Sequence, residues 1–192
     1  MKKVEYVYRE LLYQAMERSN RRVTQSELAK TLRVSLSTVN LAIKPLRRMR
    51  AVDVKPRALA IIDAKKILYY WASMRNIEKD TVYSTRADMA VNEIEKSIPD
   101  NAVYGAYTAY KLKFKDVPAD YSEIYVYGDI NERFPKSESQ PNIFALKKDA
   151  LMERYGKTTT LAQTFVDLWN LKEWYAKEFV KEMEAKLHGI LE

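Results

Sequence analysis

The chain has 192 residues, of which 47% are hydrophobic, and this suits one large domain or two small ones with a buried core. It contains no cysteine and one histidine, which excludes disulfides, thiolate metal sites, cysteine nucleophiles and histidine-rich metal sites. Apolar runs are only a few residues long, and the first residues carry no apolar stretch typical of a signal peptide. We therefore expect a cytoplasmic protein with no membrane association and no cofactor.

The net charge of +7 is unevenly distributed along the chain. Residues 1–75 hold 17 lysines and arginines against 6 acidic residues, a net +11, whereas the remaining 117 residues hold 16 against 20, a net −4. A basic region joined to a mildly acidic one is typical of a nucleic-acid-binding module with an appended sensing or partner-binding domain. Charge alone also fits a basic surface that has no partner.

The N-terminal region predicts helices with clear boundaries. Apolar residues at three- and four-residue steps predict a first helix that ends before Ser19. Thr24 and Glu27 have the spacing of a capping box, in which the Thr hydroxyl caps the Glu amide and the Glu side chain reaches back. This pair predicts that a short second helix covers residues 25–32.

A third helix follows at once. Residues 33–35 have the length of a tight turn, and Ser35 is a suitable cap for a helix over 36–49. Two short helices separated by such a turn are typical of a helix-turn-helix. The second helix of that motif is the one that enters the major groove of DNA, so residues 36–49 are the candidate recognition helix.

The candidate recognition helix has an apolar side and a polar side. Its buried face is predicted to consist of Val39, Ala42, Ile43 and Leu46. Asn40 is the best base-reading candidate, because Asn can pair bidentately with adenine. The other predicted DNA contacts on this helix are Ser37, Thr38, Leu41 and Lys44, with Arg47 and Arg48 placed to favour phosphates. The alternative is a solvated helix face with no ligand.

A hairpin is predicted after the third helix. Two β-prone runs surround Pro56 and predict that residues 51–62 form two strands and a turn. Lys55 and Arg57 lie at the predicted tip, where they can reach phosphates or a minor groove. Such a hairpin beside a helix-turn-helix would be a wing.

The stretch 24–62, above all the segments 35–40 and 46–49, resembles the winged-helix transcriptional regulators of bacteria and archaea. Those families usually have Gly where this chain has Arg50, at the turn out of the third helix. The resemblance implies a winged helix-turn-helix domain over residues 1–76 that binds double-stranded DNA. It also implies a homodimer that reads an inverted repeat.

After a linker at 78–80, the sequence predicts an α/β domain over residues 80–192 that ends in long helices. The expected elements are a strand over 81–85, a helix over 88–98, strands over 122–128 and 142–146, and a mostly helical tail over 161–191 interrupted near Asn170. The tail has an apolar stripe, for which core packing is the usual meaning and a dimer seam is the alternative. The two domains together predict an α+β fold.

Part of this second domain resembles the nucleotidyltransferase fold, in which a Gly-rich turn holds phosphate. Two carboxylates placed two residues apart on a strand bind Mg²⁺ in that family. Here the turn is Gly105-Ala106, and Glu123 stands at the first carboxylate position, but Tyr125 occupies the second and Asp120 is out of phase. We therefore expect a degenerate relative with no catalytic residue, no metal site and no enzymatic activity. An unrelated small α/β domain is the alternative.

Taken whole, the chain resembles the AbiEi-type antitoxins, which are the DNA-binding partners in type IV toxin–antitoxin pairs. This resemblance depends on the overall arrangement and on the segment 105–112. It implies a transcriptional regulator that represses its own operon and has a cognate toxin protein as a partner. The alternative function is a nucleotidyltransferase with a DNA- or RNA-binding winged helix.

Overall fold

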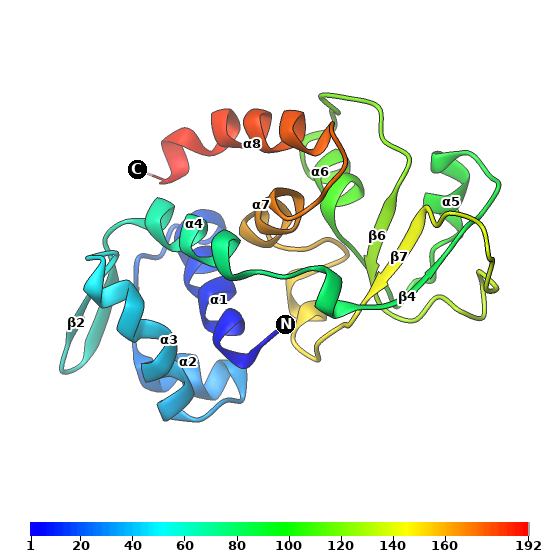
Figure 1. The fold of residues 1–192 in the computed structure, drawn as a ribbon. Coiled ribbons are helices and arrows are strands. Elements are labelled where there is room, and N and C mark those ends of the chain that lie inside the picture. The colour runs from blue at the N-terminus through cyan, green and yellow to red at the C-terminus, as the bar shows by residue number, and fades with distance from the viewer. Residues whose placement is uncertain (192) are drawn as a thin grey trace. The chain divides into compact units, whose positions relative to one another are not determined.

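The computed structural model describes residues 1–191, which form two compact units (Figure 1). The first unit consists of Met1–Arg75 together with the residues from Glu184 onward, and the second consists of Asn76–Met183. Both units combine helices with a small sheet. The α+β fold class predicted from the sequence is therefore confirmed.

The first unit contains four helices from the N-terminal region and one three-stranded antiparallel sheet. Its elements in chain order are α1 (Lys3–Glu17), β1 (Arg22–Val23), α2 (Gln25–Leu32), α3 (Leu36–Arg48), β2 (Val52–Lys55), β3 (Ala58–Ile61) and α4 (Ala64–Met74). The sheet has the order β1-β3-β2, so β3 is its central strand. The predicted helices and hairpin are present at the predicted places. The two-residue β1 was not predicted, because so short a strand has no readable alternation.

Local sequence determines where these helices begin and end. At the start of α2, the Thr24 hydroxyl accepts a hydrogen bond from the Glu27 amide at 3.1 Å, and the Glu27 carboxylate accepts one from the Thr24 amide at 3.0 Å. This is the predicted capping box. Both α2 and α3 end in a left-handed residue, Arg33 with φ +51° and Arg50 with φ +58°. After each, the next amide bonds back to a carbonyl in the last turn of its helix, which is the Schellman arrangement.

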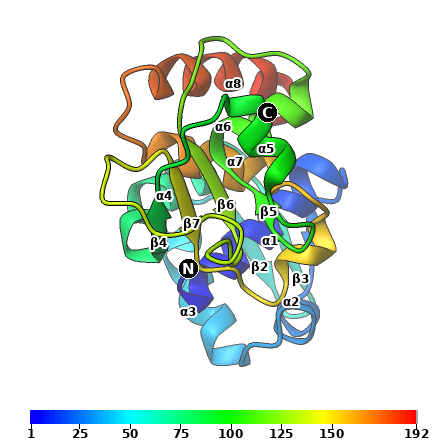
Figure 2. The same ribbon diagram turned by 90° about the vertical axis from the view of Figure 1, so that its right-hand side faces the viewer.

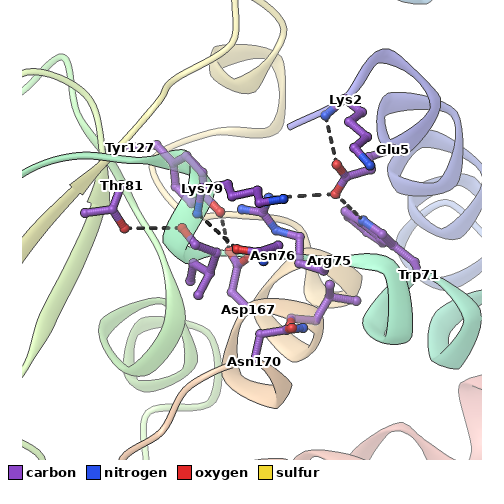
Figure 3. A network of polar contacts seen from close by, with 12 residues as sticks. Lys2, Glu5, Trp71, Arg75, Asn76, Lys79, Thr81, Tyr127, Asp167 and Asn170 are labelled. Carbon is purple, nitrogen blue, oxygen red and sulfur yellow. Dashed lines mark hydrogen bonds and ion pairs between the residues drawn. The ribbon is translucent and has the colours of Figure 1, made fainter.

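A buried polar network joins α1 to α4 inside the first unit (Figure 3). The Glu5 carboxylate accepts a hydrogen bond from the Trp71 indole nitrogen at 3.0 Å and from the Lys2 backbone amide at 2.8 Å. The Arg75 guanidinium lies 3.7 Å from the same carboxylate, and both charged groups are almost completely buried. A buried charge needs partners of this kind to offset the loss of water. Otherwise the core of this unit is mainly apolar, with α1 packed on α3 and α4.

The second unit is built on a four-stranded mixed sheet. Its elements are the short helix η1 (Glu78–Asp80), β4 (Thr81–Thr85), α5 (Val91–Ser97), β5 (Val103–Tyr104), α6 (Ala106–Phe114), β6 (Ile124–Tyr127), β7 (Ile143–Leu146), η2 (Met152–Tyr155) and α7 (Leu161–Trp169), followed by the start of α8 (Ala176–Leu191). The strand order is β4-β7-β6-β5 (Figure 2), with β6 and β7 parallel and the other pairs antiparallel. All of the elements expected for this region are present.

Alternation along β6 gives the sheet two different faces. On one face, Ile124 and Val126 join an aliphatic cluster with Ile94 and Ile98 from the region of α5. On the other face, the Tyr127 hydroxyl donates a hydrogen bond of 2.5 Å to the buried carboxylate of Asp167 on α7 (Figure 3). The second face therefore contains a buried phenol–carboxylate contact, whereas the cluster on the first face is aliphatic.

The helical tail corrects one predicted boundary. The expected interruption is present, since α7 ends with Asn170 as its C-cap and α8 begins at Ala176. However, residues from Glu184 onward belong to the first unit and not to a domain spanning 80–192. The physical reason is that this end of α8 bonds to N-terminal residues: the Tyr69 hydroxyl donates to the Glu184 carboxylate, and the Arg21 guanidinium donates to the Ile190 carbonyl. Sequence spacing alone does not reveal such long-range partners.

Most of the apolar stripe on the tail is buried within the chain, as core packing requires; its fully buried members are Leu168, Tyr175, Phe179, Met183 and Leu187.

The helices were also considered as possible membrane spans. Among residues 1–191, no helix combines the length and the apolar character that crossing a bilayer needs.

Candidate nucleic-acid interface

Helix α3 separates its apolar and polar side chains as the sequence predicted. Val39, Ala42, Ile43 and Leu46 are buried, and contacts with α1 and α2 cover this side. The predicted DNA contacts lie on the other side: Ser37, Asn40, Leu41, Lys44, Arg47 and Arg48 are exposed, and Thr38 is partly exposed. One face therefore anchors the helix, and the opposite face is free to meet a ligand.

The hydroxyl groups at the start of α3 are already engaged. The Ser35 Oγ accepts the Thr38 amide at 3.1 Å, and it also lies 2.8 Å from the Ser37 hydroxyl and 2.9 Å from the Thr38 hydroxyl. This local network caps the helix. Of the predicted contacts, Ser37 and Thr38 would thus have to share their hydroxyls between the cap and a base.

The longer polar side chains of α3 have no such competition. Within residues 1–191, Asn40, Lys44, Arg47 and Arg48 make no hydrogen bond or ion pair through their side chains. Their amide and cationic groups are exposed to solvent. Since Arg and Lys contact phosphates and the Asn amide can pair with a base edge, this set has the chemistry of a DNA-binding helix.

Two adjoining hollows lie on the exposed surface of the first unit. One, of about 550 Å³, is lined by Gln25, by Val54 and by the α3 side chains Asn40, Ile43, Lys44, Arg47 and Arg48. The other, of about 610 Å³, also contains Gln25 and Val54 and extends to the hairpin tip through Leu36, Lys55, Pro56 and Arg57. The shared residues make this a continuous groove between α3, the start of α2 and the β2–β3 hairpin, which we call the basic groove.

The hairpin supplies the far wall of the basic groove. Strands β2 and β3 pair in register from Val52 with Ile61 to Lys55 with Ala58, so the turn between them is tight. Lys55 and Arg57 are exposed at this turn, as predicted. Lys55 also makes a long ion pair with Asp53 at 3.8 Å, and because both side chains are exposed this pair is weak. It leaves the Lys55 charge available to a stronger anion.

The residues of α2 that line the groove were not among the predicted DNA contacts. Gln25 is the first residue of α2 and lines both hollows. Its backbone lies at the N-terminus of a helix, where free amides and the helix dipole favour anions. The signal was present in the sequence, because Gln25 directly follows the cap residue Thr24.

The Gly105 turn of the second unit has the geometry of a strand-to-helix connection. The Gly105 amide donates to the Tyr125 carbonyl at 2.9 Å, which holds the turn beside β6. Ala106 adopts a φ of +44°, an unusual conformation for a residue with a side chain. Glu123 precedes β6, and its negative charge contributes to raising the pKa of Tyr125. Glu123 and Tyr125 are therefore neighbours beside this turn, as expected.

A second carboxylate lies close to this pair. The Tyr125 hydroxyl donates to one oxygen of Glu173 at 2.8 Å, and the Tyr107 hydroxyl donates to the other at 3.0 Å. Burial raises the pKa of Glu123. The hydrogen bond from Ser122 lowers this pKa, and the negative charge of Glu173 raises it. Glu173 stands in the loop before α8, 50 residues after Glu123 in the sequence, so no local motif could have pointed to it.

These carboxylates do not assemble a larger ligand set. Within the part of the chain that the structure describes, no three His, Asp or Glu side chains are grouped so that they could hold a metal ion. Both oxygens of Glu173 are also occupied by phenols. The arrangement is chemically a pair of phenols anchored on a carboxylate, next to one carboxyl group that is partly desolvated.

The chain was compared with models of protein families, with curated proteins and with solved structures, and none of the three comparisons found a match. The geometry of the basic groove and of the Glu123 region is therefore the basis for the function proposed below.

Proposed function

We propose that this chain is a transcriptional regulator that binds specific double-stranded DNA through a winged helix-turn-helix. In this proposal α2 and α3 are the helix pair, α3 enters the major groove, and the β2–β3 hairpin is the wing. The observation that carries the proposal is the outward face of α3. Its Asn and cationic side chains have no partner within residues 1–191, and they line one groove together with the cations of the hairpin tip.

The dimensions and charges support this assignment. The major groove of B-DNA is about 12 Å wide and admits one α-helix. A helix of 13 residues such as α3 presents its first turns to bases while arginines in its last turn, Arg47 and Arg48, reach the flanking phosphates. The net charge of +11 in residues 1–75 adds long-range attraction for the duplex.

The test is selection from a random duplex library with the full chain, followed by titration of the selected duplex and a scrambled one. We expect the selected duplex to bind at least about 10³ times more tightly at physiological salt. Structured RNA of equal charge serves as competitor, and preferential displacement by RNA would favour the RNA-binding alternative. Equal affinity for selected and scrambled duplexes would contradict sequence-specific regulation.

A matched pair of variants locates the interface. Arg47→Ala with Arg48→Ala removes two charges from α3, whereas Lys96→Ala with Lys147→Ala removes two exposed charges from the second unit. Only the first pair should weaken binding, because only those charges face the duplex. A similar loss for both pairs would indicate that total charge, and not the basic groove, governs the interaction.

For the second unit we propose a role in assembly or partner binding without nucleotide transfer. Support comes from the phenol of Tyr125, which is a neutral donor bonded to Glu173 where the transferase family carries a metal-binding carboxylate. The raised pKa of Glu123 also disfavours the ionised form that Mg²⁺ requires. Incubation with Mg²⁺ and labelled triphosphates tests this directly, and Glu123-dependent labelling of an acceptor would contradict it.

The proposal extends to the assembly and the location of the protein. A homodimer on an inverted repeat, with a cognate toxin protein as a further partner of the mildly acidic second unit, fits the uneven charge. Mass measurement by light scattering, with and without the selected duplex, tests the dimer: one chain per half-site is expected. A regulator of this type acts where the chromosome is, which is the cytoplasm in cells without a nucleus.

A further inference from the structure

Helix α3 carries a leucine in the middle of its polar face. The Leu41 side chain is 64% exposed, whereas Leu46 on the same helix and the leucines of α1 are fully buried. An exposed leucine forfeits the free energy that its transfer out of water would give. Leu41 thus contributes little to the packing of the first unit.

The neighbours of Leu41 determine what kind of ligand it suits. Ser37 lies one turn before it and Lys44 one turn after it on the same side of α3, and both are exposed and polar. The other exposed leucine of the helix, Leu36, is 48% exposed but lines the hollow beside the hairpin tip. Leu41 is therefore a single aliphatic group among polar ones, which does not make the contiguous apolar patch that a protein partner typically needs.

Duplex DNA offers one aliphatic group in the groove that α3 is proposed to enter. The C5-methyl of thymine projects into the major groove, and apolar side chains are the ones that contact it. An apolar side chain beside Asn40 is able to report a thymine next to an adenine that Asn40 reads. Uracil lacks this methyl group, so the same contact distinguishes DNA from RNA of equal sequence.

We propose that Leu41 is a specificity-determining residue that selects thymine by packing against its C5-methyl group. This inference depends on the proposed DNA-binding function and adds to it the identity of one base class that is read. It assigns apolar readout to Leu41 and hydrogen-bond readout to Asn40, the residue next to it.

The test removes one methyl group at a time from the DNA. In the selected duplex, each thymine is replaced singly by deoxyuridine, and affinity is measured for the wild-type chain, for Leu41→Ala and for Leu112→Ala, which alters an exposed leucine of the second unit, as the matched control. For the wild-type chain, we expect one or two thymines per half-site at which the loss of the methyl weakens binding about fourfold. The same substitutions should have no effect on Leu41→Ala, whereas Leu112→Ala should retain the wild-type sensitivity.

The outcomes separate this inference from the function on which it depends. If the chain selects no duplex at all, the proposed function fails and the inference fails with it. If a duplex is selected but contains no thymine, or if uridine is tolerated everywhere, DNA binding stands and the role of Leu41 is overturned. Equal uridine sensitivity in the wild-type chain and in Leu41→Ala would also overturn it, because another residue would then read the methyl.

Discussion

The two units direct their polar groups in opposite ways. In residues 1–75 the cations of α3 are exposed to solvent, and the buried charges of Glu5 and Arg75 are paired with each other. In Asn76–Met183 the phenols of Tyr107 and Tyr125 donate to Glu173 inside the unit, and Tyr121 donates to Glu95. A group without an internal partner is available to a ligand, whereas a carboxylate that already accepts two hydrogen bonds is satisfied. The comparison teaches that these tyrosines of the second unit use their hydroxyl groups for contacts within the unit, whereas the α3 cations do not.

The largest effect expected from this contrast concerns salt. If the free cations of the first unit bind phosphates at six to ten places per dimer, affinity for the selected duplex should fall by about 10³ to 10⁵ between 50 and 200 mM salt. Binding releases counterions from the DNA, and this release is less favourable when the salt concentration is high. Fluorescence anisotropy over this range measures the slope. A flat dependence would remove the electrostatic basis of the proposal.

A second prediction tests whether the buried charge network around Glu5 is as important to the fold of the first unit as the geometry indicates. Glu5→Ala leaves the Arg75 guanidinium and the Trp71 indole without their shared acceptor, and we expect a loss of about 3 kcal/mol in the free energy of unfolding. Urea unfolding measures this loss. Glu132→Ala, which removes an exposed carboxylate, is the control and should change stability by less than about 0.5 kcal/mol. Similar stabilities for both variants would show that the network is dispensable.

A third prediction separates base reading from phosphate binding within the basic groove. Asn40→Ala should cost about 1 to 3 kcal/mol on the selected duplex and little on random DNA, because a base contact carries sequence information. Arg57→Ala at the hairpin tip should weaken both by similar factors. Competition titrations with the two DNAs give the specificity ratio. An unchanged ratio for Asn40→Ala would mean that α3 reads bases elsewhere.

A fourth prediction uses the left-handed turn at the end of α3. Arg50→Gly should stabilise the first unit by about 1 kcal/mol, because Gly adopts the φ of +58° without the steric cost that a side chain has. Arg57→Gly is the matched control, since Arg57 is not among the residues with positive φ and should gain nothing. Thermal unfolding distinguishes the two. If Arg50→Gly is also destabilising, contacts of the Arg50 side chain outweigh its backbone strain.

The smallest predicted effect belongs to the second unit. Burial raises the pKa of Glu123 in the folded chain, so ionised Glu123 disfavours folding. This penalty is absent below the pKa of the unfolded chain and is complete above the raised pKa of the folded chain. Glu123→Gln should therefore be more stable than the wild-type chain at neutral pH, with the gain disappearing as the pH falls to about 4. Urea unfolding at both pH values checks this, and a gain that grows on acidification would contradict it.

The sequence was sufficient to predict the first three helices and the hairpin of the first unit because their signals are local. The capping box at Thr24, the cap at Ser35 and the turn at Pro56 each determine a boundary within a few residues, and apolar spacing identifies the buried face of α3. Even the expectation of Gly at the position of Arg50 corresponds to a real conformational demand, because that residue is left-handed. The exposed candidates on α3 then follow from periodicity alone.

What could not be predicted depends on contacts between distant segments. Glu173 meets Tyr125 across 48 residues, and the end of α8 belongs to the first unit through Glu184 and its bond to Tyr69. Such pairings leave no spacing pattern in the sequence. For the same reason, the spacing of acidic residues along one strand indicates Glu123 but not Glu173, which a separate loop supplies.

The position of Trp71 has a spectroscopic consequence. Its indole is 0% exposed in the first unit, whereas the other two tryptophans, Trp169 and Trp174, lie in the second unit and are 45% and 76% exposed. Blue-shifted fluorescence that resists an aqueous quencher should therefore report the first unit, and quenchable red-shifted emission the second. One unlabelled sample thus provides separate optical probes of the two units, which allows their unfolding transitions to be compared without any added dye.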